Sequence, residues 1–294
     1  MARTLERAGA VNAAAALLRR EPSAAGWSLL GEALEASGDV ECATQAYGSL
    51  ADLYPERAEM LRAAAVRIDR ARPGDATALS LLRHARDDRP DQPSSHHLLG
   101  LTLLRAGKYD AAFEALAGGL GRVYEARYHG ATDLLRSDLR LAAMAWSTSE
   151  PLRAAEIARR MSVAGVPFLE GEDAPGLRAS LSWETDTSSL GLSVLDAPDE
   201  PRAVPHLHVA EAHDGFGPEM VLLDARATRS IGVRLERRGV GGEVLGVAHV
   251  IRHGSRGADL RIETRPFVLM NEYAELPLGS VVDATPAALA QNGR

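Results

Sequence analysis

Two carboxylates on alternate positions, Glu184 and Asp186, have the spacing that most suggests chemistry. If this stretch is a β-strand, residues two apart point to the same face. The two groups could then divide the general acid and general base roles of a hydrolase between them. A polar strand end is the simpler interpretation, and we prefer it. A hydrolase acting through this pair is therefore kept only as the third of three functional hypotheses.

The histidine and cysteine residues give weaker evidence for a chemical site than this carboxylate pair. His206 and His208 lie two apart on a predicted strand and share a face, a spacing that zinc can use. No third ligand accompanies them, so a solvent-facing or hydrogen-bonded pair is preferred. Cys42 is the only cysteine, which excludes an intramolecular disulfide. The sequence has no GxSxG, phosphate-loop, dinucleotide or HExxH motif, and we predict no catalytic residue and no cofactor.

Composition and charge limit the class of protein. The chain has 294 residues, which suggests two domains, and 46% of them are hydrophobic. Residues 1–165 are neutral, with 21 basic and 21 acidic residues, whereas 166–294 hold 12 basic and 19 acidic residues. An acidic second half argues against a nucleic-acid partner. The longest apolar runs fall short of the roughly 20 residues that a membrane span requires. We see no signal peptide and leave the localisation open, cytoplasmic by default.

The first 165 residues are predicted to be helical, because small and large residues recur there at a fixed spacing. That spacing resembles the tetratricopeptide repeat. Two glycines in each full repeat, at 31 and 38 and again at 100 and 107, would allow close helix packing and a helix end. A degenerate middle repeat begins near Ala58. We expect a three-repeat solenoid over 1–165, whose two clearest repeats comprise Trp27, Leu30, Gly31, Leu34, Gly38, Ala43, Tyr47 and Pro55, then His96, Leu99, Gly100, Leu103, Gly107, Tyr109, Ala112 and Leu116.

Solenoids of this kind present their first helices as a concave groove for peptides or other proteins. The groove expected here mixes acidic, basic and apolar side chains. It lacks the asparagine and lysine with which such domains clamp a peptide carboxylate, so a different protein partner is predicted. The groove positions are Ser28, Glu32, Glu35, Arg62, His97 and Leu101.

A linker rich in Gly, Pro, Glu and Asp is predicted over 166–176. After it the hydrophobic period changes to two, which is typical of strands. Short strands separated by turn residues favour an antiparallel β-sandwich over 177–284, with a partly open barrel as runner-up and a flexible tail over 285–294. The eight predicted strands are 177–183, 190–195, 206–210, 220–224, 231–237, 244–253, 260–270 and 273–278.

The β half also carries motifs that resemble the YfaP-like domain of unknown function. These motifs are Leu181-Ser182-Trp183-Glu184-Thr185-Asp186, Leu192-Ser193-Val194-Leu195-Asp196, Gly215-Phe216-Gly217-Pro218-Glu219, and Arg265-Pro266-Phe267-Val268-Leu269-Met270-Asn271. In bacteria this module often follows tetratricopeptide repeats, sometimes behind VIT and von Willebrand factor A domains, which fits the arrangement here. The family has no assigned reaction.

Members of that family tend to carry an acidic and histidine cluster that could hold a cation. This chain has Ser189, Gly191 and Ser193 at the matching places, and only Asp186 and Asp196 remain close by. Hard cations need several oxygen ligands. We therefore predict no metal and interpret the aspartates as turn caps.

The sequence thus predicts an α+β two-domain protein, a tetratricopeptide-like solenoid followed by a β-sandwich. We expect a non-enzymatic interaction or assembly module that docks a protein partner in its helical groove. The alternative is a sandwich that binds carbohydrate or another cell-surface ligand, supported by the repeats. The chain is also expected to function within a larger complex or a longer polypeptide.

Overall fold

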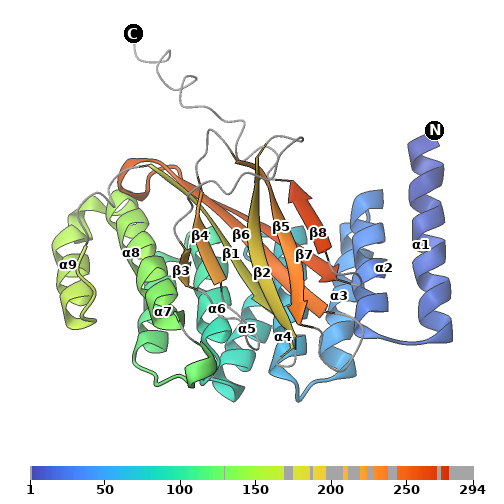
Figure 1. Cartoon of the computed structure of the whole chain (residues 1–294), viewed down its shortest axis with the longest axis horizontal. Helices are drawn as coiled ribbons and strands as arrows, with labels where there is room; N and C mark the ends of the chain where they lie inside the picture. The colour runs from blue at the N-terminus through green and yellow to red at the C-terminus, as the bar shows by residue number, and fades with distance from the viewer. Residues whose placement is uncertain are drawn as a thin grey trace, which may run out of the picture.

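The computed structural model describes residues 2–128, 130–168, 175–185, 188–196, 208–210, 219–223, 228–237, 244–269 and 273–277. Within these ranges, helices fill the first half and antiparallel sheets the second, so the predicted mixed α+β class and its order along the chain are confirmed. Figure 1 shows the helices as a row beneath the sheets.

The helical half consists of antiparallel neighbours that pack in chain order. Gly38 and Gly107 have φ of +92° and +69°, the helix-ending conformation predicted for them. A Cβ at Gly31 would overlap the Tyr47 ring, and one at Gly100 would overlap Leu116, so both glycines allow close helix approach as predicted. The helices are α1 (Ala2–Arg20), α2 (Ala24–Ser37), α3 (Val40–Leu53), α4 (Ala58–Ala71), α5 (Ala76–Asp88), α6 (Pro93–Arg105), α7 (Tyr109–Leu120), α8 (Ala131–Ser149) and α9 (Ala154–Val163).

Each of the eight predicted strands has a counterpart in the described residues. A five-stranded sheet has the order β3-β4-β1-β6-β7, and a three-stranded sheet has the order β2-β5-β8. All strand pairs are antiparallel. The strands are β1 (Gly176–Trp183), β2 (Ser189–Asp196), β3 (His208–Ala210), β4 (Glu219–Leu222), β5 (Thr228–Arg237), β6 (Val244–His253), β7 (Arg261–Leu269) and β8 (Tyr273–Pro277).

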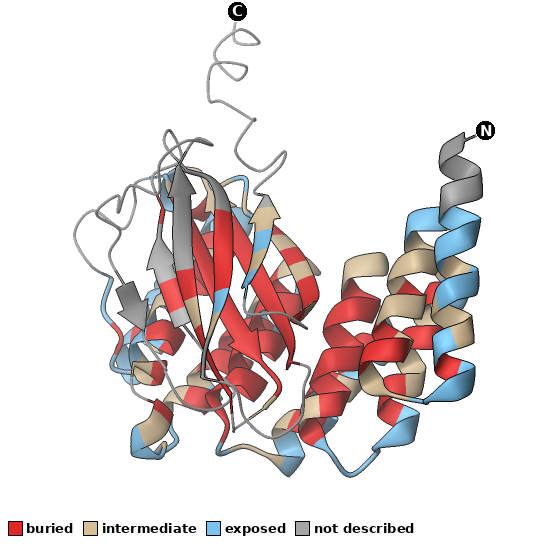
Figure 2. Ribbon diagram, turned by 45° about the vertical axis from the view of Figure 1, so that its right-hand side comes forward, coloured by how far each residue is buried: buried red, intermediate tan, exposed pale blue. Residues whose placement is uncertain are grey.

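The central strands of the five-stranded sheet, β1 and β6, are buried on both faces. One face shares a hydrophobic cluster with the three-stranded sheet, including Trp183, Leu190 and Ile231. The other face adds apolar side chains to the main helical core, namely Met220, Val247, Ile251 and Ile262. Figure 2 shows buried residues continuing from the sheets into the helices beneath. The sheet therefore lies on the inner side of the helical row, which is the side where the sequence predicts a partner groove.

Candidate functional site

Strand β1 presents a polar face to the helices. Its sequence from Leu177 to Glu184 alternates apolar and polar residues, and in a strand such residues point to opposite faces. The apolar ones join the cluster between the sheets. The polar ones, Arg178, Ser180, Ser182 and Glu184, are all buried. Three of them contact α4, α6 and α8, so the candidate site is built where this strand crosses the helices.

At one end of the crossing, Arg62 on α4 binds Glu184. The Arg62 Nη2 atom lies 2.7 Å from Glu184 Oε2, and Nε donates to the same carboxylate at 3.0 Å. Nη1 of Arg62 donates to Gln92 Oε1 at 2.6 Å and to Ser95 Oγ at 2.9 Å. The side chains of the pair are 0% and 4% exposed. Burial raises the pKa of the Glu184 carboxyl, and the Arg62 charge opposes that rise.

At the other end, Asp138 on α8 accepts hydrogen bonds from two directions. The Asp138 Oδ1 atom accepts from Arg178 Nη2 at 2.6 Å, while Oδ2 lies 2.6 Å from His97 Nδ1. Arg178 also donates to Ser137 Oγ at 2.7 Å. The opposite nitrogen of His97, Nε2, lies 3.2 Å from Ser180 Oγ. This carboxylate joins α6, α8 and β1.

Ser180, His97 and Asp138 thus have the order of contacts found in a hydrolase triad. Three observations argue against that chemistry in this conformation. All three residues are fully buried. Strand β1 is paired with β4 and with β6 across Ser180, which leaves its backbone N–H in the sheet rather than facing a reacting carbonyl. Neither of the two surface hollows around α9 is lined by any of the three. In this conformation the arrangement holds the strand in place.

His249 on β6 completes the buried polar layer. Its ring lies edge-on to that of His97, with 5.9 Å between the centroids. Burial lowers the pKa of His249 well below its usual value, and the neighbouring His97 and Arg105 lower it further. His249 is therefore neutral at pH 7, in an environment that disfavours an added proton.

The two ion pairs have opposite polarity. At Glu184 the strand carries the acid and the helix the base, whereas at Arg178 the strand carries the base and α8 the acid. If β1 ran the other way, Arg178 would meet Arg62 and Glu184 would meet Asp138. Because like charges in a buried site are strongly unfavourable, this arrangement selects one direction and one register for the strand.

The predicted groove residues fall into two groups. Ser28, Arg62, His97 and Leu101 are buried, and Arg62 and His97 bind the chain's own strand. Leu101 belongs to the main hydrophobic core, and the Ser28 hydroxyl donates to the Ala24 carbonyl. In this conformation, these four are not available to another protein.

Glu32 and Glu35 of α2 are half-buried. Glu35 accepts from Tyr47 OH at 2.9 Å and from Arg70 Nη2 at 2.6 Å. Burial raises the pKa of Glu32, opposed by Arg67 and Arg70. These two are the predicted groove positions that stay partly open to solvent.

The predicted carboxylate pair and metal candidates are not brought together within the described residues. Glu184 is used by Arg62, and Asp186 lies outside the described residues. Asp196 ends β2, but its side chain also lies outside them, as does all of His206. In the part of the chain that the structure describes, no group of three or more possible metal-binding side chains occurs. No helix within these ranges has the length and apolarity to cross a bilayer.

Sequence reasoning missed Asp138, Arg178 and Ser180. Alternation in a strand indicates one apolar and one polar face, and a polar face ordinarily meets water. One signal was present: Arg62, Arg67 and Asp69 stand within a helix whose other residues are mostly apolar. Charged side chains on an inner helical face predict a polar surface packed against them.

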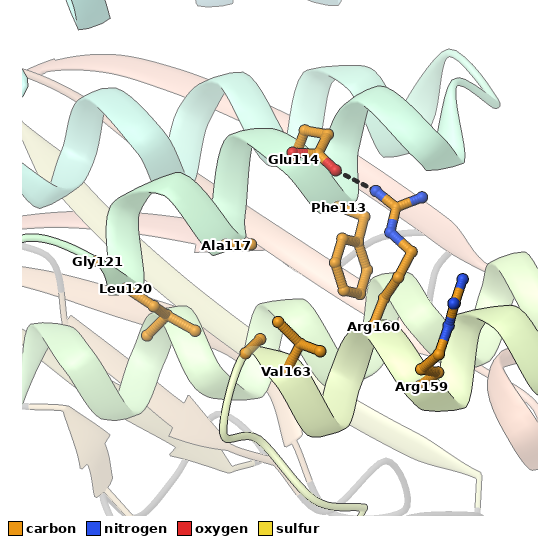
Figure 3. Close-up of a pocket in the computed structure, with 9 residues that line it drawn as sticks. Phe113, Glu114, Ala117, Leu120, Gly121, Arg159, Arg160 and Val163 are labelled. Carbon is orange, nitrogen blue, oxygen red and sulfur yellow. Dashed lines mark hydrogen bonds and ion pairs between the residues drawn. The ribbon is translucent and has the colours of Figure 1, made fainter.

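Two surface hollows flank α9. The first, of about 610 Å³, lies between α7 and α9 and is lined by Phe113, Leu120 and Val163 among others. Figure 3 shows Arg160 at its edge, bonded to Glu114. The second, of about 600 Å³, lies on the other side of α9 against Met144 and Phe168. Each flank of the last helix therefore borders an open hollow.

A scan against protein-family models finds no match to this chain, and a search of curated proteins finds no relative. The tetratricopeptide-like and YfaP-like resemblances therefore remain predictions from the residues.

Proposed function

We propose that the chain is a non-enzymatic assembly module. In this proposal the helical half is a tetratricopeptide-like solenoid and the β half a YfaP-like sandwich. The solenoid holds the sandwich on its inner face through β1, and a protein partner binds on a surface that this contact leaves open.

The observation that carries the proposal is the charged crossing of β1. The inner helical face binds an extended segment of polypeptide, as solenoids do, but the segment belongs to the same chain. Buried ion pairs contribute more to specificity than to stability. Because the two ion pairs have opposite polarity, they support the proposal that the helical surface fixes the orientation of the β half.

The buried Ser180, His97 and Asp138 supply the sharpest test of the non-enzymatic part. We expect a fluorophosphonate probe, which reacts with activated serines, to leave Ser180 unmodified in the native chain, as judged by intact mass. A Ser180→Ala variant is the matched control. Labelling of the native chain that Ser180→Ala abolishes would overturn the proposal in favour of a hydrolase.

Cysteine chemistry tests the occupied inner face. In a Cys42→Ser background, Ser180→Cys places a thiol under β1, whereas Cys42 of the natural chain is exposed. We expect the thiol at 180 to react with a maleimide far more slowly than the thiol at 42. Equal rates would mean that the inner face is open, as the sequence alone predicts.

The carbohydrate-binding alternative stays a prediction, since no observation on the described strands favours it.

A further inference from the structure

The outward side of α9 carries an unusual stripe of residues. Ile157 and Met161 face inward and are buried. Leu152, just before the helix, is fully exposed at 102%, and Val163 at its end is 86% exposed. Between them, Glu156 and Arg159 complete a series spaced i, i+4, i+7 and i+11. The last three residues lie along one side of α9, and Leu152 precedes them in the 3-10 turn Pro151–Arg153. The stripe reads apolar, acidic, basic, apolar.

This stripe is complementary to itself when reversed. A two-fold axis between Ile157 and Ala158 would place Glu156 of one copy opposite Arg159 of the other, twice. The same axis places Leu152 opposite Val163, also twice. Self-complementarity of this kind is what a two-fold dimer contact requires. From it we infer that α9 binds α9 of a second copy of this chain, antiparallel.

The hollow between α7 and α9 gives the apolar end of this contact a receiving surface. Val163 lines it together with Phe113 and Leu120, as Figure 3 shows. In the antiparallel pairing, Leu152 of the second copy lies against Val163, at the edge of this hollow. A leucine with no cover in one copy thereby meets an unfilled apolar hollow in the other.

The charged side chains of α9 also favour a second copy of this chain as the partner. Arg160 is already committed to Asp110 and Glu114 and stacks on Phe113. Arg159 is exposed and has no ion pair within the described residues, so its charge remains for a partner. Glu156 is half-buried and accepts two hydrogen bonds from Arg153 of the same chain, so a second copy's Arg159 would share this carboxylate with Arg153.

The contact is small, because α9 has only 10 residues. Standard interfaces bury roughly 800 Å² on each partner, and a smaller contact implies a transient dimer with a dissociation constant of about 10 to 100 µM. This inference rests on the proposed assembly function and names one partner for it.

Sedimentation velocity of the full chain, over concentrations that span this range, tests the inference. We expect a reversible monomer–dimer equilibrium for the natural sequence. Leu152→Asp should weaken it by about tenfold or more, since it places a charge in the apolar contact. Leu17→Asp is the matched control, because this exposed leucine lies on α1 at the opposite end of the helical row (Figure 1). A monomer throughout the range, or equal effects of the two variants, would overturn the inference.

Charge exchange makes the test specific to the proposed pairing. Glu156→Arg and Arg159→Glu should each weaken the dimer by about tenfold, because like charges then face each other. An equimolar mixture of the two variants should restore it, since one copy then carries two arginines and the other two glutamates. No heterodimer in the mixture would overturn the pairing. If the chain is monomeric, the inferred dimer is wrong but the proposed assembly function stands. If the fluorophosphonate probe labels Ser180, the proposed function is wrong, and the result says nothing about the dimer.

Discussion

The two faces of β1 are packed in opposite ways. Toward the three-stranded sheet it presents Leu177, Ala179, Leu181 and Trp183, which join an apolar cluster. Toward the helices it presents a row of polar side chains that end in ion pairs. Apolar burial stabilises in proportion to area but without direction. Charged pairs contribute little net stability and determine which groups may meet. One strand therefore holds the β half together with one face and orients it on the helices with the other.

Trp183→Ala should produce the largest loss on the apolar face. The side chain is fully buried, so its removal leaves a cavity as well as lost contacts. We expect a loss of about 3–5 kcal/mol in the free energy of unfolding, measured by urea denaturation. A loss below about 1 kcal/mol would mean that the cluster between the sheets is not a packed core.

On the polar face, Glu184→Leu should lower the free energy of unfolding nearly as much, by about 3–5 kcal/mol. The change removes the carboxylate that binds Arg62 and leaves the Arg62 charge in a buried site without it. The double variant Arg62→Met with Glu184→Leu should recover most of this loss, since two apolar groups can replace a buried pair at little cost. If the double variant is as unstable as the single one, the pair contributes more than orientation.

Acid should weaken the contact between sheet and helices through His249. Its folded-state pKa is lowered, so the unfolded chain binds the proton more readily and stability is lost as the pH falls below about 6.5. The slope from this one group is at most about 1.4 kcal/mol per pH unit. Comparing the natural chain with His249→Leu isolates it, because the other groups titrate in both. Parallel stability curves between pH 4 and 7 would contradict this assignment.

The smallest effect is expected for an exposed ion pair. Arg72 and Glu41 are in contact, but their side chains are 41% and 66% exposed. Arg72→Ala should change stability by less than about 1 kcal/mol, because solvent screens such pairs. This variant is the matched comparison for Glu184→Leu, and a similar loss in both would remove the distinction between buried and exposed pairs.

The elements themselves could be predicted from the sequence. The paired glycines at 31 and 38, and at 100 and 107, indicate the helix packing and ends that are observed. The change of hydrophobic period after residue 176 places the strands. Both signals are local, because each depends on residues close together in the chain.

The site could not be predicted in this way, because it joins residues far apart in the chain. Arg62 and Glu184 are 122 positions apart, and Asp138 is 40 positions from Arg178. Arg62 and His97 were expected to bind a separate protein, and the sequence does not show that a strand of the same chain lies on them. A polar strand face has the same alternation whether it meets water or a charged helical surface.

Charge exchange across the crossing of β1 tests the central claim most directly. Arg62→Glu and Glu184→Arg should each lower the free energy of unfolding by about 3 kcal/mol or more, because each puts two like charges in a buried site. The chain with both changes restores an oppositely charged pair and should regain most of that stability in urea denaturation. If the two losses simply add in the double variant, these side chains do not recognise each other and the account is wrong.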